Sequence, residues 1–426
     1  MTDQVETRKP ATPVKDLLFY ILLLVLSLAF FATVRNNTFW HSSDYLYLLH
    51  AIKIDGDWRE IFAQAPLNIF QPFVNGVFYL EYRLFGLNAT GYYLFNIFVH
   101  SLNAYLVYRI VYTLLRDGII SVLSSLLFAC AVGNYGKAVM VVSGINDLLI
   151  TFLTLITLFA YFKNELTRNG NVKSIWFLAT LLLFTLSLLS KTTSFSILGC
   201  MFAFNFFFRA ETKRPLFGRS FVILAAFAFV VLVVKLSLLP EIPGLSDLAF
   251  FSSSFLRNFG SYLVRMVFPI HASDLVRDSG PLVRFIYAAA TEIRVVTFLF
   301  ILSYSVFGFV FGNRVIRFFI AWTYITVVPF CMFKFPSDWL NISYLYLVSV
   351  GFVLILASGT VLAARLLYQR PWRRFIPYLV PLYFVFLSQF IIQHLDRNYE
   401  RLADSPSLDS FKTQLYQDRS GDQGEL

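Results

Sequence analysis

The sequence FQPFVNGVFYLEYRLFGLNATGYYLFNIFVHSLNAYLVY, residues 70–108, joins a short helix to a long apolar one. The first part starts at a proline and ends near Gly86 and Asn88, which are residues typical of a turn. The second part belongs to an apolar segment, residues 92–114, that is long enough to cross a bilayer. The stretch therefore predicts a compact helix at a membrane surface, followed by a spanning helix.

Three polar residues lie along the predicted spanning helix. Asn96, His100 and Asn103 follow one another at spacings of four and three, so they share one helix face. Polar side chains within a span usually face the protein interior or a cavity. Hydrogen bonding between helices accounts for such a face, and we favour this interpretation over catalysis.

The whole chain has the composition of a membrane protein. Of its 426 residues, 58% are hydrophobic and 14% are charged, whereas a soluble domain is nearer a quarter charged. We predict an all-α integral membrane fold, a bundle of about 11 transmembrane helices with amphipathic helices in two long outer loops. The predicted spans are 17–34, 92–114, 119–133, 143–162, 174–190, 194–208, 219–238, 292–312, 315–333, 343–363 and 375–393.

The short loops predict the orientation. Lys and Arg concentrate in alternate loops, on the side of the N-terminus, which is the pattern of cytoplasmic loops. The two long loops, 35–91 and 239–291, are then outside, and residues 254–269 of the second predict an interfacial helix. We predict a transmembrane domain over residues 1–393 and a polar C-terminal tail, 394–426, on the outer side.

Several classes of site have no support in the sequence. The three cysteines form no CxxC, the five histidines form no HExxH, and no glycine-rich nucleotide motif is present. The net charge of +10 is explained by the basic loops rather than by nucleic acid. We predict no metal, no cofactor and no nucleic-acid partner.

The outer loops carry two acidic candidates. Asp44, in FWHSSDYLYLL, could act as a general base on a hydroxyl at the membrane surface. It could equally cap the helix that follows, because Ser42, Ser43 and Asp44 precede an apolar helix. Asp147, in VVSGINDLL, lies at the outer start of a span, where capping is the simpler interpretation.

A lysine and a tyrosine are further candidates in the outer turns. Lys191, in LLSLLSKTTSFS, could hold a lipid-linked phosphate by charge-assisted hydrogen bonds, or simply extend to the membrane surface. Tyr344, in NISYLYLVSVG, could contact a ligand or belong to an interfacial aromatic belt.

Taken in order, these segments resemble the GT-C superfamily of polytopic glycosyltransferases. The pattern is most similar to lipid-phosphate-mannose O-mannosyltransferases with tetratricopeptide repeats and to their bacterial relatives, although the repeat domain is absent here. The resemblance covers residues 17–393 and depends on the order of its motifs. The motifs are FGLNATGYYLFNIFVHSLNA, SGINDLL, LLSLLSK, YLVRMVFP and NISYLYLVSVG.

The resemblance implies a donor sugar on a polyprenyl or dolichyl phosphate. By this resemblance Asp44, the first-loop acid, is the base, and Lys191 contacts the donor phosphate, with Arg265 as a second cation. The chain departs from the family at Gln71, where an arginine is common, and at Lys137, which stands near the position of an acid. The predicted substrate contacts are Gln71, Asn75, His100, Lys137, Asp147 and Tyr344.

We therefore predict a membrane glycosyltransferase that acts on the non-cytoplasmic face, in a bacterial inner membrane with its site towards the periplasm. It would move a sugar from a polyprenyl-phosphate donor to a hydroxyl of a surface or secreted protein, such as a pilin-like subunit, or of an envelope glycan. The predicted partners are membrane lipid, the lipid-linked sugar and the acceptor. Two alternatives stay open, a non-catalytic scaffold of an envelope complex and a transporter of lipid-linked glycans.

Overall fold

The computed structural model describes most of the chain, and the structural statements below concern these residues. They are 13–66, 69–131, 137–213, 215–238, 253–267, 290–332, 342–369, 372–403, 409–410 and 412–413. The longer helices are α1 (Pro13–Phe30), α2 (Ser42–Gly56), α3 (Pro72–Phe85), α4 (Ala89–Leu115), α5 (Gly118–Cys130), α7 (Ile145–Thr167), α8 (Ile175–Leu188), α9 (Ser196–Phe207), α11 (Arg219–Leu238), α12 (Ser253–Val267), α15 (Ala290–Phe311), α16 (Arg314–Cys331), α17 (Leu345–Leu366) and α18 (Leu379–Ala403).

Short helical turns connect several of these helices. They are α6 (Lys137–Met140), α10 (Arg209–Thr212) and the 3-10 turns η1 (Val34–Asn36), η2 (Trp58–Phe62), η3 (Val142–Gly144), η4 (Thr192–Phe195), η5 (Ile342–Tyr344) and η6 (Arg373–Tyr378). In the described part of the chain every regular element is helical. Each of the predicted apolar segments contains an α-helix.

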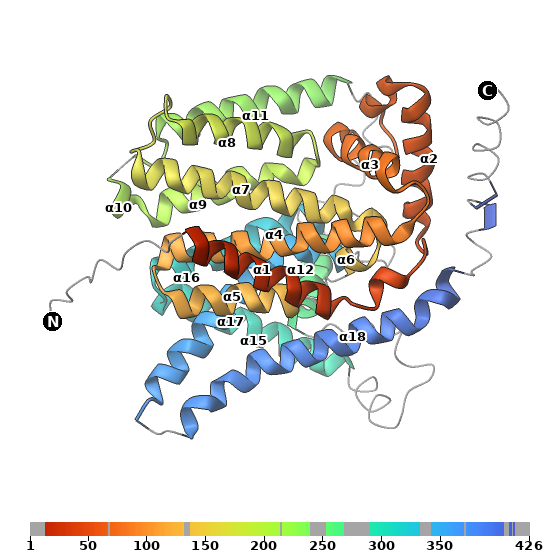
Figure 1. Cartoon of the computed structure of the whole chain (residues 1–426). Helices are drawn as coiled ribbons and strands as arrows, with labels where there is room; N and C mark the ends of the chain where they lie inside the picture. The colour runs from red at the N-terminus through yellow and green to blue at the C-terminus, as the bar shows by residue number, and fades with distance from the viewer. Residues whose placement is uncertain are drawn as a thin grey trace.

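The helices form a bundle around α4 and α7. Helix α4 packs against α1, α5 and α7, and α17 packs against α5 and α16. Helices α8, α9 and α11 form a layer beside α7, and α15 and α18 lie on the far side of the bundle (Figure 1). Helix α18 continues past the predicted domain boundary at residue 393, and the outer position of the tail stays a prediction.

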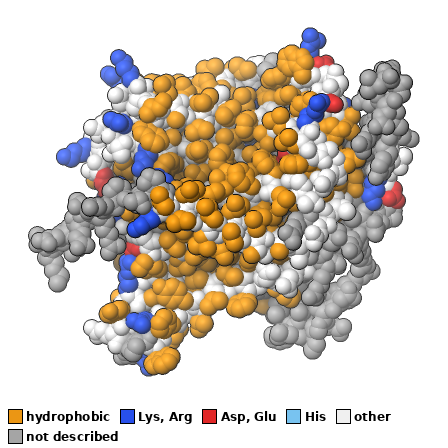
Figure 2. All heavy atoms as spheres, viewed as in Figure 1, with side chains coloured by type: hydrophobic (Ala, Val, Ile, Leu, Met, Phe, Trp, Pro, Cys, Tyr) orange, Lys and Arg blue, Asp and Glu red, His pale blue; other side chains and the backbone are white. Residues whose placement is uncertain are grey.

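The surface of the bundle is suited to lipid. Within the described residues, six helices are long and apolar enough to cross a membrane, and three shorter helices are also apolar. Large apolar side chains of α15, such as Val296, Phe300 and Phe311, are well exposed. Figure 2 shows a broad hydrophobic face across the middle of the bundle, with Lys and Arg side chains at its rims. An aqueous setting would penalise so much contiguous apolar surface, and the predicted all-α membrane fold is confirmed.

Helices α2 and α3 cover one end of the bundle (Figure 1). They lie in the predicted first outer loop, and they are joined by an ion pair of 2.6 Å between Arg83 and Asp55, to which Tyr79 also donates a hydrogen bond. Both helices bury one face, which includes Tyr45, Tyr47 and Phe78. This end therefore carries an ordered cap.

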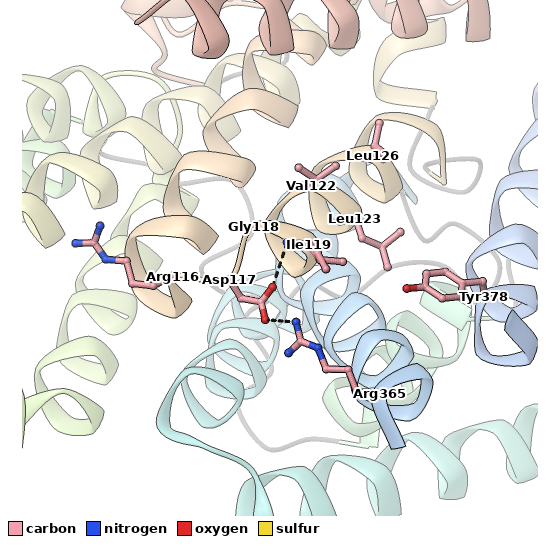
Figure 3. Close-up of a pocket in the computed structure, with 9 residues that line it drawn as sticks. All are labelled: Arg116, Asp117, Gly118, Ile119, Val122, Leu123, Leu126, Arg365 and Tyr378. Carbon is pink, nitrogen blue, oxygen red and sulfur yellow. Dashed lines mark hydrogen bonds and ion pairs between the residues drawn. The ribbon is translucent and has the colours of Figure 1, made fainter. Parts of the chain in front are cut away.

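A crevice of about 720 Å³ opens elsewhere, between α5 and η6 (Figure 3). Its floor is apolar and includes Ile119, Leu123 and Leu126 of α5, with Tyr378 of η6 opposite. At its rim Asp117 accepts hydrogen bonds from the first backbone N–H groups of α5 and pairs with Arg365 of α17 at 2.7 Å. Asp117 is thus both a helix N-cap and half of an ion pair.

These two roles of Asp117 can be separated. We expect Asp117→Ala to lower the free energy of unfolding by about 1–2 kcal/mol, because the cap and the ion pair are both lost. Arg365→Met removes a half-exposed ion pair only, and we expect a loss below about 1 kcal/mol. Asp117→Asn keeps the cap and should resemble Arg365→Met. Unfolding of the full chain in detergent measures all three, and equal losses for Asn and Ala at residue 117 would contradict the capping role.

Candidate active site

Asp44 lies in the first turn of α2 and joins that helix to the start of α7. Its Oδ2 accepts a hydrogen bond from the His41 backbone N–H at 3.3 Å, and the His41 ring accepts one from the Ser43 N–H, which together form a capping box. Its Oδ1 accepts a shorter bond, 2.8 Å, from the Ser143 N–H. The N-cap of α2 is thus His41 and not Asp44, which completes the capping box from inside the helix and also links α2 to η3.

The Asp44 carboxyl is fully buried. Burial raises the pKa of Asp44 to about 6, although the hydrogen bonds from Ser143 and His41 oppose this shift. The carboxylate accepts hydrogen bonds from the backbone and side chain of Ser143 and from the backbone of His41 and Trp40, so an acceptor hydroxyl must displace one of these donors to reach it. The side chain is a carboxyl that changes its protonation state near neutral pH.

Close packing holds the turn that precedes α7. A Cβ on Gly144 would lie 2.1 Å from the carbonyl oxygen of Ala138, so glycine lets η3 pack directly on α6. From the other side, Asn96 of α4 donates a hydrogen bond of 2.9 Å to the Val141 carbonyl. These contacts set the position of Asp147 in the first turn of α7.

Lys191 and Asp147 form the ion pair of this site. Nζ and Oδ1 are 2.7 Å apart, and the two side chains are only 18% and 12% exposed. Nζ also lies 4.7 Å from the ring centroid of Tyr344, whose ring stacks on Phe330. Burial is the largest single influence and disfavours the ammonium, but the charge and hydrogen bond of Asp147, together with Tyr344 and Tyr47, outweigh it and raise the pKa of Lys191. The lysine is therefore a permanent cation held by one carboxylate and one aromatic face.

The turn that carries Lys191 is supported by a second buried lysine. Lys235 of α11 donates a hydrogen bond to the carbonyl oxygen of Leu188, the last residue of α8. A cation at a helix C-terminus is favourable, because the last carbonyl groups carry partial negative charge. The Phe73 N–H of α3 bonds the Leu189 carbonyl at 3.4 Å. Helices α3, α8 and α11 thus meet beside Lys191.

Tyr47 connects α2 and α3 to the first turn of α7. Its hydroxyl oxygen accepts hydrogen bonds from the side-chain amides of Gln71 and Asn146, the latter at 2.6 Å. The ring is 2% exposed, and burial raises the pKa of Tyr47 to about 12. The phenol is therefore neutral at physiological pH, next to the ion pair of Lys191 and Asp147.

Helix α12 brings a second buried phenol to the same place. It packs against α16 and α17, and Tyr262 is fully buried. Burial raises the pKa of Tyr262, the neighbouring Tyr344 and Asp147 raise it further, and Arg265 opposes them. Tyr262 is therefore close enough to Tyr344 and Asp147 for their charges to affect it. The name Lys191 cluster is used below for Tyr47, Gln71, Asn146, Asp147, Lys191, Tyr262 and Tyr344.

The structure brings together four of the predicted site residues, Gln71, Asp147, Lys191 and Tyr344, in the Lys191 cluster. Arg265 is half-buried on α12, three residues beyond Tyr262. Asp44 precedes Tyr47 by three residues on α2, and it contacts the backbone next to the cluster.

Three other predicted residues have different surroundings. The side-chain amide of Asn75 donates to two carbonyls of the loop before α3, so it holds that loop. The ring nitrogens of His100 lie 2.6 Å from the Tyr346 hydroxyl and 3.2 Å from the Ala129 carbonyl, in the fully buried core. This is the interhelical bonding that we favoured for the polar face of α4. Lys137 begins α6, and its side chain lies outside the described residues.

Tyr47, Asn146 and Tyr262 are not among the residues predicted from the sequence. Helical spacing was a usable signal for two of them, because Tyr47 lies three residues after Asp44 and Tyr262 three residues before Arg265. Asn146 directly precedes Asp147, and its contact with Tyr47 depends on how η3 orients the first turn of α7. Within the described residues no three metal-ligating side chains come together. The prediction that no metal or cofactor is needed stays untested.

Solved structures with a similar fold come from membrane proteins. The archaeal oligosaccharyltransferase AglB from Archaeoglobus fulgidus, in complex with an inhibitory peptide and a dolichol-phosphate, superposes with a TM-score of 0.52 and 12% identity. The match covers 90% of this chain and 56% of AglB. The apo form of the Archaeoglobus oligosaccharyltransferase gives a TM-score of 0.51 and 13% identity.

The chain has the GT-C fold. A second GT-C protein, ArnT from Cupriavidus metallidurans bound to undecaprenyl phosphate, has a TM-score of 0.48 and 14% identity over 96% of this chain and 76% of its own. No family model matches the sequence, and no curated protein matches it in sequence. The GT-C resemblance read from the sequence is confirmed for the fold, and the chain is an integral, multi-pass membrane protein.

The buried hydrogen bonds between the polar face of α4 and Tyr346 of α17 can be tested by mutation. Tyr346→Phe removes the hydroxyl that His100 and Asn103 share, and we expect a loss of about 1 kcal/mol of unfolding free energy. Tyr383→Phe, on the exposed face of α18, is the matched control and should cost almost nothing. Thermal unfolding in detergent measures both variants. An unchanged stability of Tyr346→Phe would contradict a structural role for these bonds.

Proposed function

We propose that this protein is a membrane glycosyltransferase that takes its sugar from a polyprenyl-phosphate carrier. The main support for the proposal is the Lys191 cluster. It holds a largely buried ammonium among polar side chains at the α2–α3 end of a GT-C fold. Lipid-linked sugars present their phosphate at the membrane surface, where such a cation can meet it. The AglB neighbour was solved with a dolichol-phosphate, which fits this donor class.

Lys191 is the proposed ligand of the donor phosphate. Its present partner, Asp147, carries one negative charge, and a glycosyl phosphodiester carries one as well. Lys191 has three donor hydrogens, so a phosphate can bind Nζ beside the Asp147 carboxylate by charge-assisted hydrogen bonds, and a second cation then balances the second anion. Arg265 on α12 is proposed as a second cation at the phosphate. Gln71, Asp147 and Tyr344 then border the sugar or the phosphate.

Asp44 is the proposed general base. An acceptor hydroxyl attacks the anomeric carbon, and its proton passes to a carboxylate oxygen of Asp44. The new bond joins the acceptor oxygen to the anomeric carbon, and the bond from that carbon to the phosphate oxygen breaks. The electron pair leaves with the phosphate, which departs as polyprenyl phosphate. Attack from the face opposite to the phosphate inverts the anomeric configuration.

The proposed acceptor is a hydroxyl of a surface or secreted protein, such as a pilin-like subunit, or of an envelope glycan. The proposed setting is a bacterial inner membrane with the Lys191 cluster facing the periplasm, in keeping with the basic loops at the other end. A non-catalytic scaffold would bind the lipid-linked sugar without turnover, and a transporter would move it between leaflets. The experiment below separates these possibilities.

The first test is made in the native host after deletion of the gene. Intact masses of surface proteins and compositions of envelope glycans are compared after complementation with wild type, Asp44→Asn or Asp147→Asn. We expect wild type to restore one sugar mass and Asp44→Asn to lose at least about a hundredfold in transfer, because the asparagine amide is not a base. Expression level and thermal stability serve as controls for folding.

Each other outcome has a definite meaning. Full transfer by Asp44→Asn would leave Asp44 as a cap only. A loss confined to Asp147→Asn would move the base to Asp147, whose side chain is the more accessible of the two carboxylates. An unchanged mass spectrum in every strain would reject the transferase and favour the scaffold.

The pKa of Asp44 predicts a pH dependence. A base must be unprotonated, so we expect transfer to fall about tenfold for each pH unit below about 6 and to level off above it. Stability should move the other way, because a raised carboxyl pKa gives a stabilising contribution at acid pH that is lost as pH rises through about 6. Asp55→Asn, on the exposed side of α2, should keep the wild-type profile. A flat profile between pH 4.5 and 7 would contradict Asp44 as base.

A further inference from the structure

Among the buried hydroxyl groups that lack a partner in the described residues, two belong to residues near Lys191. Within the described residues, Tyr262 Oη and Thr193 Oγ1 are shielded from solvent and have no hydrogen-bond partner. Tyr47 Oη accepts from two side-chain amides, which fill both lone pairs of its oxygen, so its own proton is left to point elsewhere. The Lys191 cluster thus holds at least two phenol protons that no described acceptor receives.

Such groups need an explanation, because a buried hydroxyl without a partner costs about 1–3 kcal/mol. Native structures contain few of them, and an absent ligand or water is a usual reason. Tyr47 comes from α2 and Tyr262 from α12. The Tyr47 hydroxyl bonds to Asn146, which directly precedes Asp147, and Asp147 acts on the pKa of both phenols. Hydroxyl donors around one ammonium together form a binding site for an anion.

We propose that Tyr47 and Tyr262 donate hydrogen bonds to the phosphate oxygens of the lipid-linked donor while Lys191 binds the same phosphate. The proposal rests on the function proposed above and adds two residues to it. Hydrogen bonds from neutral hydroxyls to an anionic oxygen are short and strong. Helices α2 and α12, which belong to different loops, would then be joined through the phosphate.

The same donors favour the leaving group. When the anomeric bond breaks, the bridging oxygen becomes a terminal phosphate oxygen, and the phosphate changes from one negative charge towards two. Donors placed around that phosphate bind the dianion more strongly than the diester, so they lower the barrier to departure. The released polyprenyl phosphate should therefore bind more tightly than the sugar-loaded donor.

Tyr262→Phe is the decisive variant. It removes an unpartnered hydroxyl and leaves no other group unpaired, so the ligand-free protein should keep its stability. We expect the Kd for a short-chain polyprenyl phosphate to rise about tenfold, as for the loss of one hydrogen bond to a charged group. Binding to the purified full chain in detergent is followed by the shift in thermal unfolding. The matching polyprenyl alcohol, which lacks the phosphate, should bind both proteins equally.

Tyr47→Phe has a matched control on the same helix. It should weaken polyprenyl phosphate binding about tenfold as well, although it also leaves the amides of Gln71 and Asn146 without their acceptor. Tyr45 of α2 donates its proton to the Phe39 carbonyl at 3.0 Å, so Tyr45→Phe should lower stability and leave the Kd unchanged.

The outcomes distinguish this proposal from the proposed function. Wild-type affinity in both Tyr47→Phe and Tyr262→Phe, with binding abolished in Lys191→Met, would overturn the role of the phenols and keep the phosphate site. Failure of the wild-type protein to bind polyprenyl phosphate would overturn the proposed function together with this inference. A higher Kd for polyprenyl phosphate in Tyr262→Phe, at unchanged stability and unchanged alcohol binding, supports the proposed hydrogen bonds from the phenols to the phosphate.

Discussion

A polar group inside a bilayer protein must find its partner within the protein, and this constraint organises the α2–α3 end of the bundle. Asn96 and Asn103 of α4 reach the backbone at the start of α7, to Val141 and Leu148 respectively. The Asp44 carboxyl of α2 accepts a hydrogen bond from the Ser143 N–H in the same region. The first turn of α7 is therefore held from two sides, and it is the turn that carries the acidic half of the central ion pair.

The ion pair of Lys191 and Asp147 is a consequence of that placement. Neither charge would be tolerated alone at this depth, because the desolvation of an unpaired ion exceeds what a few hydrogen bonds return. As a pair they can both stay charged in a partly buried site. Because its charge is largely buried, Lys191 depends on the residues that position its turn. One of them is Lys235, which donates a hydrogen bond to the carbonyl at the end of α8.

The site is assembled from segments that are distant in the chain. Tyr47 comes from the loop after α1, Lys191 from the turn after α8, and Tyr262 from the loop after α11. The transmembrane bundle acts as the frame, and short amphipathic helices cover one end of it (Figure 1). This arrangement suits the proposed function, in which the donor is anchored in lipid and the acceptor arrives from water.

The sequence by itself determined the membrane class, the helical fold and the positions of its helices, because long apolar segments in a bilayer have few alternatives to helices. Its motif order also identified Asp147, Lys191 and Tyr344 as residues worth testing. Only the tertiary structure decided that these three meet and that His100 bonds within the core. The tertiary structure also decided that the phenols of Tyr47 and Tyr262 belong to the Lys191 cluster. Such contacts depend on how distant helices pack, and hydropathy along one chain carries no record of that packing.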